Sequence, residues 1–174
     1  MPSSWWAGAV PANYGCIVLV TREWFDRCLE RGCTVYCLPP GHRPHIGKLT
    51  PGSLCLVLAK SGRTPRTEWT FVGEFTVRGL KFVRGEDFHA YAPRAVEVPE
   101  APFPKPGEVS WVIEFDSLVR YPRPVRLGEC TDIRTSTSLV PMSRWRILGF
   151  TLIRPSDVAR VVEAIRARAG YVPG

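Results

Sequence analysis

The sequence predicts an α+β fold in which about six or seven short strands form one small, bent or barrel-like mixed sheet with flanking helices. Short apolar segments recur along the chain and are separated by Pro-Gly and similar turn signals, which is typical of such a sheet. Amphipathic helical spacing occurs in two segments, one towards each end. With 174 residues, 45% of them hydrophobic, we expect one domain over residues 14–170, preceded by a tail over residues 1–13.

The first strand is expected at Cys16–Val20, a run of five apolar residues that continues without a loop into a helix. The helix should extend from about Arg22 to Arg31, because Thr21 is a good N-cap and Gly32 suits the position past the end. Four apolar side chains at helical spacing should face the core: Trp24, Phe25, Cys28 and Leu29. Where a buried strand meets a helix N-terminus, free backbone N–H groups suit a small polar or anionic ligand.

The middle of the chain alternates between apolar segments and turns. A Pro-Gly turn at residues 51–52 precedes a continuous apolar run, and Pro99 to Gly107 holds four prolines in nine positions, which predicts an external loop. Strands or partly extended segments are expected at Thr34–Leu38, Leu54–Lys60, Thr70–Val77, Arg94–Val98, Trp111–Phe115, Val125–Leu127 and Trp145–Leu152.

A second helix is expected from about Ser156 to Arg168, with Gly170 placed to end it. Its apolar residues recur at the spacing of one helix face and are Val158, Val161, Val162 and Ile165. No apolar run approaches the roughly 20 residues needed to cross a bilayer. We therefore expect a cytoplasmic protein without a membrane partner.

The net charge of +7 is unevenly distributed, because residues 119–174 carry ten basic and four acidic side chains. A one-sided cationic field concentrates polyanions, of which phosphate backbones are the commonest. Charge alone is equally compatible with arginines that are merely solvated surface residues. Arginine outnumbers lysine 19 to 4, glutamine is absent and Asn13 is the only asparagine. This depletion of thermolabile amides is typical of thermophile proteins.

Thiol and imidazole side chains, which zinc prefers, gather in one stretch of the sequence: Cys28, Cys33, Cys37, His42 and His45. The spacing disfavours a metal site, because Cys28 belongs to the helix stripe and only Cys33 and Cys37 have a suitable separation. The alternatives are a disulfide within this group or plain buried thiols. We expect no metal and no other cofactor.

Arginine, tryptophan and hydroxyl side chains are interleaved at residues 134–138 (Arg-Thr-Ser-Thr-Ser) and 143–146 (Ser-Arg-Trp-Arg). An indole ring stacks on a nucleobase for about 1–3 kcal/mol, and guanidinium groups hold phosphates bidentately. The alternative is that Trp145 packs inside while Arg144 and Arg146 point to water. A nucleophile elbow, a phosphate loop and a paired-carboxylate motif are all missing from the sequence.

Several segments, in order, match a known pattern: Ile17–Trp24, Tyr36–Pro39, Ile46–Lys60, Phe71–Val77, Tyr91–Val98 and Ser143–Trp145, with Ile153–Ile165 as a closing helix. This order resembles the EVE domain and its relatives in the PUA-like superfamily, which includes the ASCH and YTH domains. The resemblance covers roughly residues 14–168, and its specificity lies in the order of the segments. Residues 99–142 match poorly, and the asparagine often found near Arg22 and the tryptophan often found near Tyr36 are missing. These differences suggest a separate, archaeal branch.

The resemblance implies a pocket that accepts a single, often modified, nucleobase. Extruding a base from a duplex costs a few kcal/mol, which stacking can return. At the matching positions the pocket residues would be Thr21, Arg22, Trp24, Leu38, Pro39, Lys60, Arg144 and Trp145. We expect a phosphate-binding surface from Arg120, Arg123, Arg126, Arg134 and Arg146.

The leading hypothesis is a non-enzymatic module that binds nucleic acid and recognises RNA or a modified base. It supposes that the cleft beside Thr21 opens on the same side as the arginine-rich last third. An alternative is a small amidohydrolase of ASCH type acting on an acylated nucleoside, with Lys60 as general base beside Thr21 and a carboxylate such as Glu74. A further alternative is a protein-interaction module whose basic face meets an acidic partner. The oligomeric state is left open.

Overall fold

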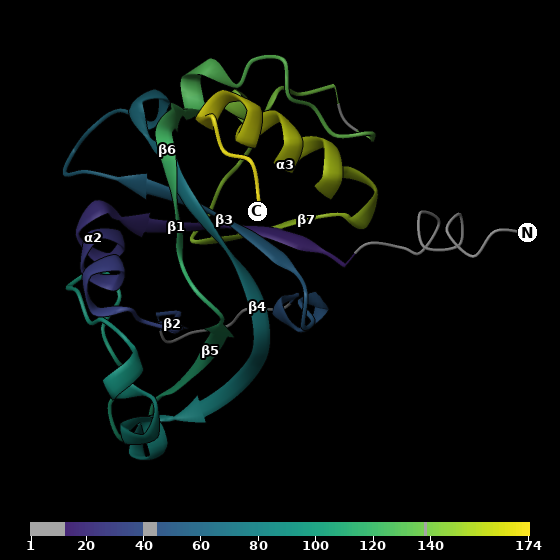
Figure 1. Ribbon diagram of the computed structural model, residues 1–174. Coiled ribbons are helices and arrows are strands. Elements are labelled where there is room, and N and C mark those ends of the chain that lie inside the picture. The colour runs from purple at the N-terminus through teal and green to yellow at the C-terminus, as the bar shows by residue number, and fades with distance from the viewer. Residues whose placement is uncertain (1–12, 40–44, 138) are drawn as a thin grey trace, which may run out of the picture.

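The computed structural model describes residues 13–39, 45–137 and 139–174. The strands and α-helices of these residues are β1 (Gly15–Thr21), α2 (Arg22–Arg31), β2 (Val35–Cys37), β3 (Leu54–Lys60), β4 (Thr70–Arg84), β5 (Val109–Phe115), β6 (Val119–Arg126), β7 (Phe150–Ile153) and α3 (Pro155–Ala169). The strands form one mixed, strongly bent sheet, with α2 and α3 packed at its sides (Figure 1). The α+β class predicted from the sequence is confirmed. Most of the expected tail, residues 1–12, lies outside the described residues.

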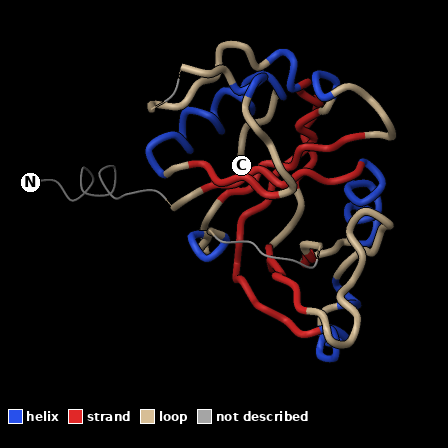
Figure 2. The backbone as a smooth tube through the Cα atoms, turned by 180° about the vertical axis from the view of Figure 1, so that it is seen from behind, coloured by secondary structure: helices blue, strands red, loops and turns tan. Residues whose placement is uncertain are grey.

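The strand order is β2-β5-β4-β3-β1-β7, and β6 also pairs with β4. β1 and β3 are parallel neighbours, and every other pair is antiparallel. β4 is fifteen residues long. Its first part pairs with β3 and β6 and its second part pairs with β5, so that it connects the two halves of the sheet. Figure 2 shows from behind how the strands curve from the centre towards the lower end. This bend gives the sheet its barrel-like form.

β5 and β6 run along the same edge of β4 as one strand interrupted at residues 116–118. β5 pairs with residues 77–84 of β4 and β6 with residues 70–74. The approach of β6 requires a glycine, because a Cβ on Gly73 would lie 2.0 Å from the carbonyl oxygen of Val119 and 3.0 Å from the ring of Phe25. A side chain at this position would push β6 away from β4.

Alternate residues of β1 and β3 face two separate apolar cores. Val18 and Val57 face the core that α2 covers, whereas Ile17 and Leu56 face the core that α3 covers. From α3 this second core receives Val161, Val162, Ile165 and Ala169. α2 and α3 each begin where a strand has just ended. Each helix is fixed to the sheet by its apolar face.

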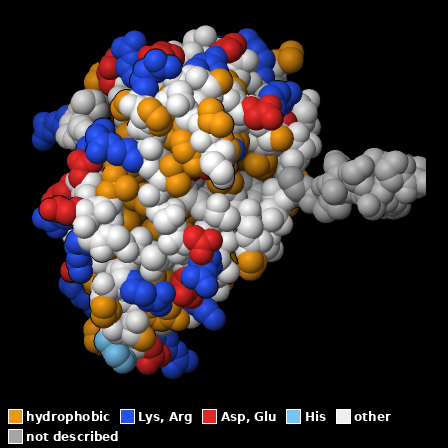
Figure 3. Space-filling model, viewed as in Figure 1, with side chains coloured by type: hydrophobic (Ala, Val, Ile, Leu, Met, Phe, Trp, Pro, Cys, Tyr) orange, Lys and Arg blue, Asp and Glu red, His pale blue; other side chains and the backbone are white. Residues whose placement is uncertain are grey.

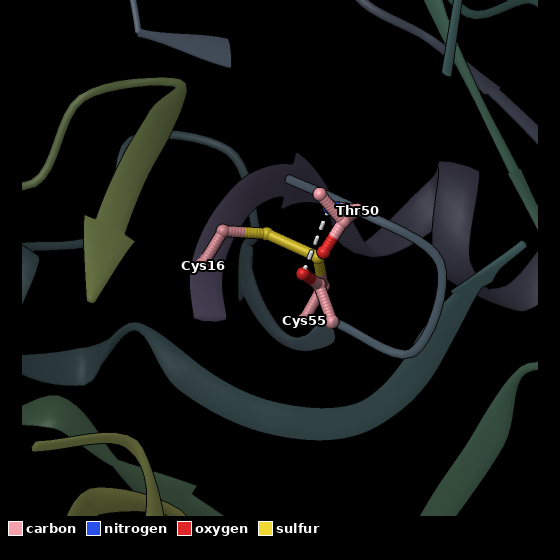
Figure 4. The surroundings of a disulfide bond; sticks show 4 residues. Cys16, Thr50 and Cys55 are labelled. Carbon is pink, nitrogen blue, oxygen red and sulfur yellow. Dashed lines mark hydrogen bonds between the residues drawn. A yellow bond between two sulfur atoms is a disulfide. The ribbon is translucent and has the colours of Figure 1, made fainter. Parts of the chain in front are cut away.

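A disulfide joins Cys16 of β1 to Cys55 of β3 (Figure 4). The two residues are directly opposite in the parallel register, with Cα atoms 4.6 Å apart. The other four cysteines are buried free thiols: Cys28, Cys33, Cys37 and Cys130. The alternative of a disulfide within the group at residues 28–37 is therefore wrong, because the sheet register brings together cysteines 39 positions apart.

The zinc hypothesis gains no support from the part of the chain that is described. His42 lies outside it, and the described residues contain no group of three or more His, Cys, Asp or Glu side chains that could hold a metal ion. In the same residues, no helix is long and apolar enough to cross a membrane.

Most predicted elements are confirmed, and three predictions need correction. The strand expected at Thr70–Val77 begins at Thr70 but continues to Arg84. The strand expected at Arg94–Val98 is wrong: a 3-10 turn occupies Ala92–Arg94, and Val98 makes only an isolated bridge to Ala101. The apolar residues of this segment, Ala95, Val96 and Val98, pack into the cores from a loop. The strand expected at Val125–Leu127 begins much earlier, at Val119. β6 pairs with β4 only, and prolines are tolerated on a strand that pairs on one side.

Candidate functional site

A cavity of about 200 Å³ opens where β1 and β3 end and α2 begins. Thr21 ends β1 and caps α2, because its Oγ1 accepts a hydrogen bond from the backbone N–H of Trp24 at 3.2 Å. The parallel register places Thr21 beside Lys60, the last residue of β3. Both residues line the cavity, so the strand-to-helix junction that the sequence singles out forms one of its walls.

Aromatic and aliphatic side chains form the inner wall. The indole of Trp24 is 1% exposed and meets the ring of Tyr36 edge-on, with ring centroids 5.0 Å apart. Leu38 and Pro39, which follow β2, continue this wall. An apolar lining with a few polar groups is the usual form of a small-molecule site.

Three polar side chains with different chemistry complete the lining. Thr21 offers a hydroxyl, Lys60 an ammonium and Glu100 a carboxylate. The loop that carries Glu100 folds back on itself, because the N–H of Ala101 donates to the carbonyl of Val98 at 3.0 Å. The cavity can therefore offer hydrogen-bond donors and an acceptor to one bound group.

Five of the eight predicted pocket residues line this cavity: Thr21, Trp24, Leu38, Pro39 and Lys60. Arg22 instead lines an open groove beside Arg120, and its Nε donates to Asp26 at 3.1 Å. Arg144 and Trp145 line a different groove. The cavity thus receives five of the six predicted residues from the first half of the chain and neither of the two from the last third.

The groove that holds Arg144 and Trp145 lies between β7 and the first turn of α3 and has a volume of about 490 Å³. Trp145 packs in part against the core under α3, and its Nε1 donates to the carbonyl of Val140 at 2.8 Å. Arg144 and Arg146 are exposed at the groove. A short segment separates the groove from the cavity, since Gly149 lines the cavity and Arg146 the groove.

The five predicted phosphate-binding arginines are all exposed: Arg120, Arg123, Arg126, Arg134 and Arg146. Arg126 is already paired, with Glu129 at 2.9 Å and Glu68 at 3.7 Å, and these carboxylates raise the pKa of its guanidinium. Arg134 donates to the carbonyl of Leu139. Figure 3 shows Lys and Arg side chains along the upper and left rim of the face in view, interspersed with Asp and Glu. This face is therefore mixed in charge.

Glu74, the carboxylate that the enzyme hypothesis places beside Lys60, belongs to a buried network elsewhere. Its Oε1 accepts hydrogen bonds from Tyr121 Oη and Arg166 Nε, both at 2.8 Å, and its Oε2 accepts from Arg166 Nη2 at 2.5 Å. Burial and the adjacent carboxylate raise the pKa of Tyr121. In the register Glu74 stands opposite Leu56, four residues before Lys60. The expectation that it lies beside Lys60 is therefore wrong.

Several lining residues are absent from the predicted pocket. Val98, Glu100 and Ala101 belong to or adjoin the proline-rich segment that the sequence predicts as an external loop, yet they close the cavity. Val98 and Ala101 are 2% and 9% exposed, so the apolar residues beside the prolines are the one local signal. Gly149 also lines the cavity, and its carbonyl accepts from the N–H of Leu19 at 3.0 Å.

No protein-family model matches the chain, and neither does the sequence of any curated protein. Solved structures are similar in fold. The ASCH protein of Zymomonas mobilis aligns with a TM-score of 0.60 at 12% identity, covering 86% of this chain and 94% of that one. A hypothetical protein from Leishmania major gives a TM-score of 0.55 at 14% identity, with 89% and 96% covered. The N-terminal domain of McrB from Staphylothermus marinus gives 0.51 at 13% identity, with 88% and 93% covered. The chain therefore has the PUA-like fold that the order of its motifs implies.

Proposed function

We propose that this chain is a nucleic-acid-binding module that takes one base of a strand into the cavity between β1, β3 and α2. The observation that carries the proposal is the composition of this cavity, in which Trp24 and Tyr36 form an aromatic wall and Thr21, Lys60 and Glu100 supply polar groups. Aromatic rings pack on any base, and polar side chains can pair with its edge.

The size of the cavity supports a ligand as small as one base. Pockets for drug-sized molecules enclose roughly 300–1,000 Å³, whereas this cavity holds about 200 Å³. A single planar heterocycle suits the smaller space. The rest of the strand would remain outside, where the surface decides its binding.

The charge of the protein supports a polyanion as the partner. The chain carries a net charge of +7, and phosphate contacts supply most of the affinity in nucleic-acid complexes. Arg22 and Arg120 lie in one groove and Arg144 and Arg146 in another. Phosphates of a strand leaving the cavity would have cations available in both grooves.

The polar groups suggest how a base would be held. The ammonium of Lys60 can donate to a ring nitrogen or carbonyl oxygen, and the carboxylate of Glu100 can accept from an exocyclic amine. A modification that adds a methyl group would meet the apolar wall at Leu38 and Pro39. A modified base is therefore the finer proposal, with RNA as the strand that the sequence leads us to expect.

Equilibrium binding to single strands of about eight nucleotides tests this proposal. We expect Lys60→Met and Glu100→Gln each to weaken binding about tenfold, which corresponds to about 1.4 kcal/mol. Matched controls are Lys105→Met and Glu163→Gln, which change the same charges at exposed positions outside the cavity lining. Equal effects of the cavity variants and the controls would contradict base capture.

A second candidate function is hydrolysis of an acylated nucleoside. One observation favours it: the hydroxyl of Thr21, the ammonium of Lys60 and the carboxylate of Glu100 line one cavity, which is the kind of cluster that can activate water or a nucleophile. Incubation with N4-acetylcytidine, followed by chromatography for cytidine and acetate, separates the two candidates. Turnover that Lys60→Met abolishes would favour the enzyme, and binding without turnover would favour the module.

A further inference from the structure

We propose that the groove between β7 and the first turn of α3 is a second ligand site, which binds the phosphate and the ribose hydroxyl of a ribonucleotide. The inference rests on the proposed function, since we expect this ribonucleotide to neighbour the captured base in the same strand. Its consequence is a preference for RNA over DNA.

Three arginines supply the cationic part of this site. Arg144, Arg146 and Arg154 are exposed and line the groove, and within the described ranges none of them lies within ion-pair distance of a carboxylate. The nearby arginines that do have a carboxylate partner are Arg126, Arg160, Arg166 and Arg168. The three groove arginines can therefore offer their charge to a phosphate, which guanidinium groups bind bidentately.

The acceptor of the site is Asp157 in the first turn of α3, which also lines the groove. Its side chain is 1% exposed. Oδ1 accepts from the backbone N–H of Ser136 and from Nη2 of Arg160, both at 2.7 Å. Oδ2 is buried and has no hydrogen-bond partner among the residues described. A buried carboxylate oxygen without a donor is costly, so a ligand that brings a small donor would gain affinity here.

The phosphate of the ligand and the carboxylate of Asp157 are both anions and would repel each other. Neighbouring arginines offset this repulsion. Arg160 neutralises Asp157 through Oδ1, and Arg154 donates from Nη1 to the hydroxyl of Thr137 at 3.3 Å, across the groove. The groove thus combines cations for an anionic group with one acceptor for a neutral donor. A phosphate next to a sugar hydroxyl has this combination, and carboxylates bind ribose hydroxyls in dinucleotide sites.

The ribose hydroxyl is the donor that a strand carries nearest to its phosphate. The 2′-hydroxyl adjoins the 3′-phosphate in RNA and is missing in DNA, and it is the group by which proteins distinguish the two. The indole of Trp145, held by its bond to Val140, is part of the same groove and offers a surface for the attached base. A ribonucleotide would therefore use all three kinds of group.

The two sites lie close enough for neighbouring nucleotides. Arg146 lines the groove and Gly149 lines the cavity, and three residues of fully extended chain span about 10 Å at most. Thr151, two residues beyond Gly149, lines the groove again and pairs in register with Ile17 of β1. A strand that leaves the cavity past Gly149 would reach the groove within one or two nucleotides.

Binding of RNA and DNA strands of the same sequence tests the inference. We expect the wild-type protein to bind RNA about tenfold more tightly, and a single 2′-deoxy substitution beside the captured base to remove most of that preference. The double variant Arg144→Gln/Arg146→Gln should weaken RNA binding about tenfold or more. Its control, Arg84→Gln/Lys105→Gln, removes the same charge at exposed positions outside the groove lining and should change affinity by much less.

The variant Asp157→Asn should lower RNA affinity and leave DNA affinity unchanged. Because Asp157 is buried, its folding must be checked by thermal unfolding, and the 2′-deoxy strand tests the same contact without any substitution. Equal wild-type affinity for RNA and DNA would overturn the inference. So would equal losses in the groove variant and in its control.

Failure of the inference differs from failure of the proposed function. If Lys60→Met and Glu100→Gln weaken strand binding while the groove variants match their control, only the second site is overturned. If the cavity variants instead match their controls in strand binding, base capture fails. The groove chemistry still stands in that case if a free ribonucleoside 3′-monophosphate binds and loses affinity in Arg144→Gln/Arg146→Gln.

Discussion

Thr21 and Lys60 are register partners at the ends of the parallel strands β1 and β3, and both line the same cavity. Thr21 is also the N-cap of α2. The hydroxyl and the ammonium are therefore placed by three elements at once: two strands that fix their spacing and a helix that begins beside them. A site built on regular elements is held more firmly than one built on loops alone.

The approach of β6 to β4 depends on Gly73. We expect Gly73→Ala to lower the free energy of unfolding by about 3 kcal/mol or more, because its Cβ would lie 2.0 Å from the carbonyl oxygen of Val119. Gly79→Ala in the same strand is the matched control, since its nearest neighbour is the end of the Glu114 side chain at 3.9 Å. Urea unfolding of the two variants measures the difference, and similar losses would contradict this account.

The buried pair of Glu74 and Arg166 should be costly to break. Removing the carboxylate in Glu74→Leu leaves the guanidinium and the hydroxyl of Tyr121 without their acceptor, and we expect a loss of about 3–5 kcal/mol. The double variant Glu74→Leu/Arg166→Met should recover a large part of that loss. A double variant no more stable than Glu74→Leu would show that the two side chains are not energetically coupled.

The disulfide between Cys16 and Cys55 should stabilise the junction of β1 and β3. For a loop of this length the chain-entropy relation gives about 4 kcal/mol. Reduction by dithiothreitol should therefore lower the melting temperature of the wild-type protein. Cys16→Ala/Cys55→Ala should melt at the same temperature with and without the reductant.

Buried thiols should make stability depend on alkaline pH. Burial raises the pKa of Cys37 and that of Cys130 from 9.0 to about 11. The folded state therefore retains these protons between pH 9 and pH 11 while the unfolded chain loses them, so the stabilisation is complete below pH 9 and is lost as pH rises towards 11. The unfolding free energy of Cys130→Ala should fall less over this range than that of the wild type. Parallel pH curves for the two proteins would contradict the shift.

Much of the fold can be predicted from local signals. Thr21 before α2, Gly32 after it and the apolar run of β3 each determine an element from its own residues. The disulfide cannot be predicted in this way, because Cys16 and Cys55 meet only through the register of two parallel strands. The loop residues Val98 and Ala101 are buried by long-range packing, which periodicity does not record.

The candidate site is predictable only in part, because some of its residues have local signals and others are placed by long-range packing. Thr21, Trp24 and Lys60 lie in or beside regular elements whose order is visible in the sequence, and they line one cavity. Arg144 and Trp145 follow a long irregular segment, so their distance from that cavity depends on how the segment is folded. The structure places them in the neighbouring groove, with Asp157 of α3.

A crystal structure of the protein with a short RNA strand tests base capture most directly. The account predicts one base inside the cavity, against the Trp24 and Tyr36 wall and within hydrogen-bond distance of Lys60 or Glu100. A strand bound elsewhere on the surface, with the cavity unoccupied, would contradict it.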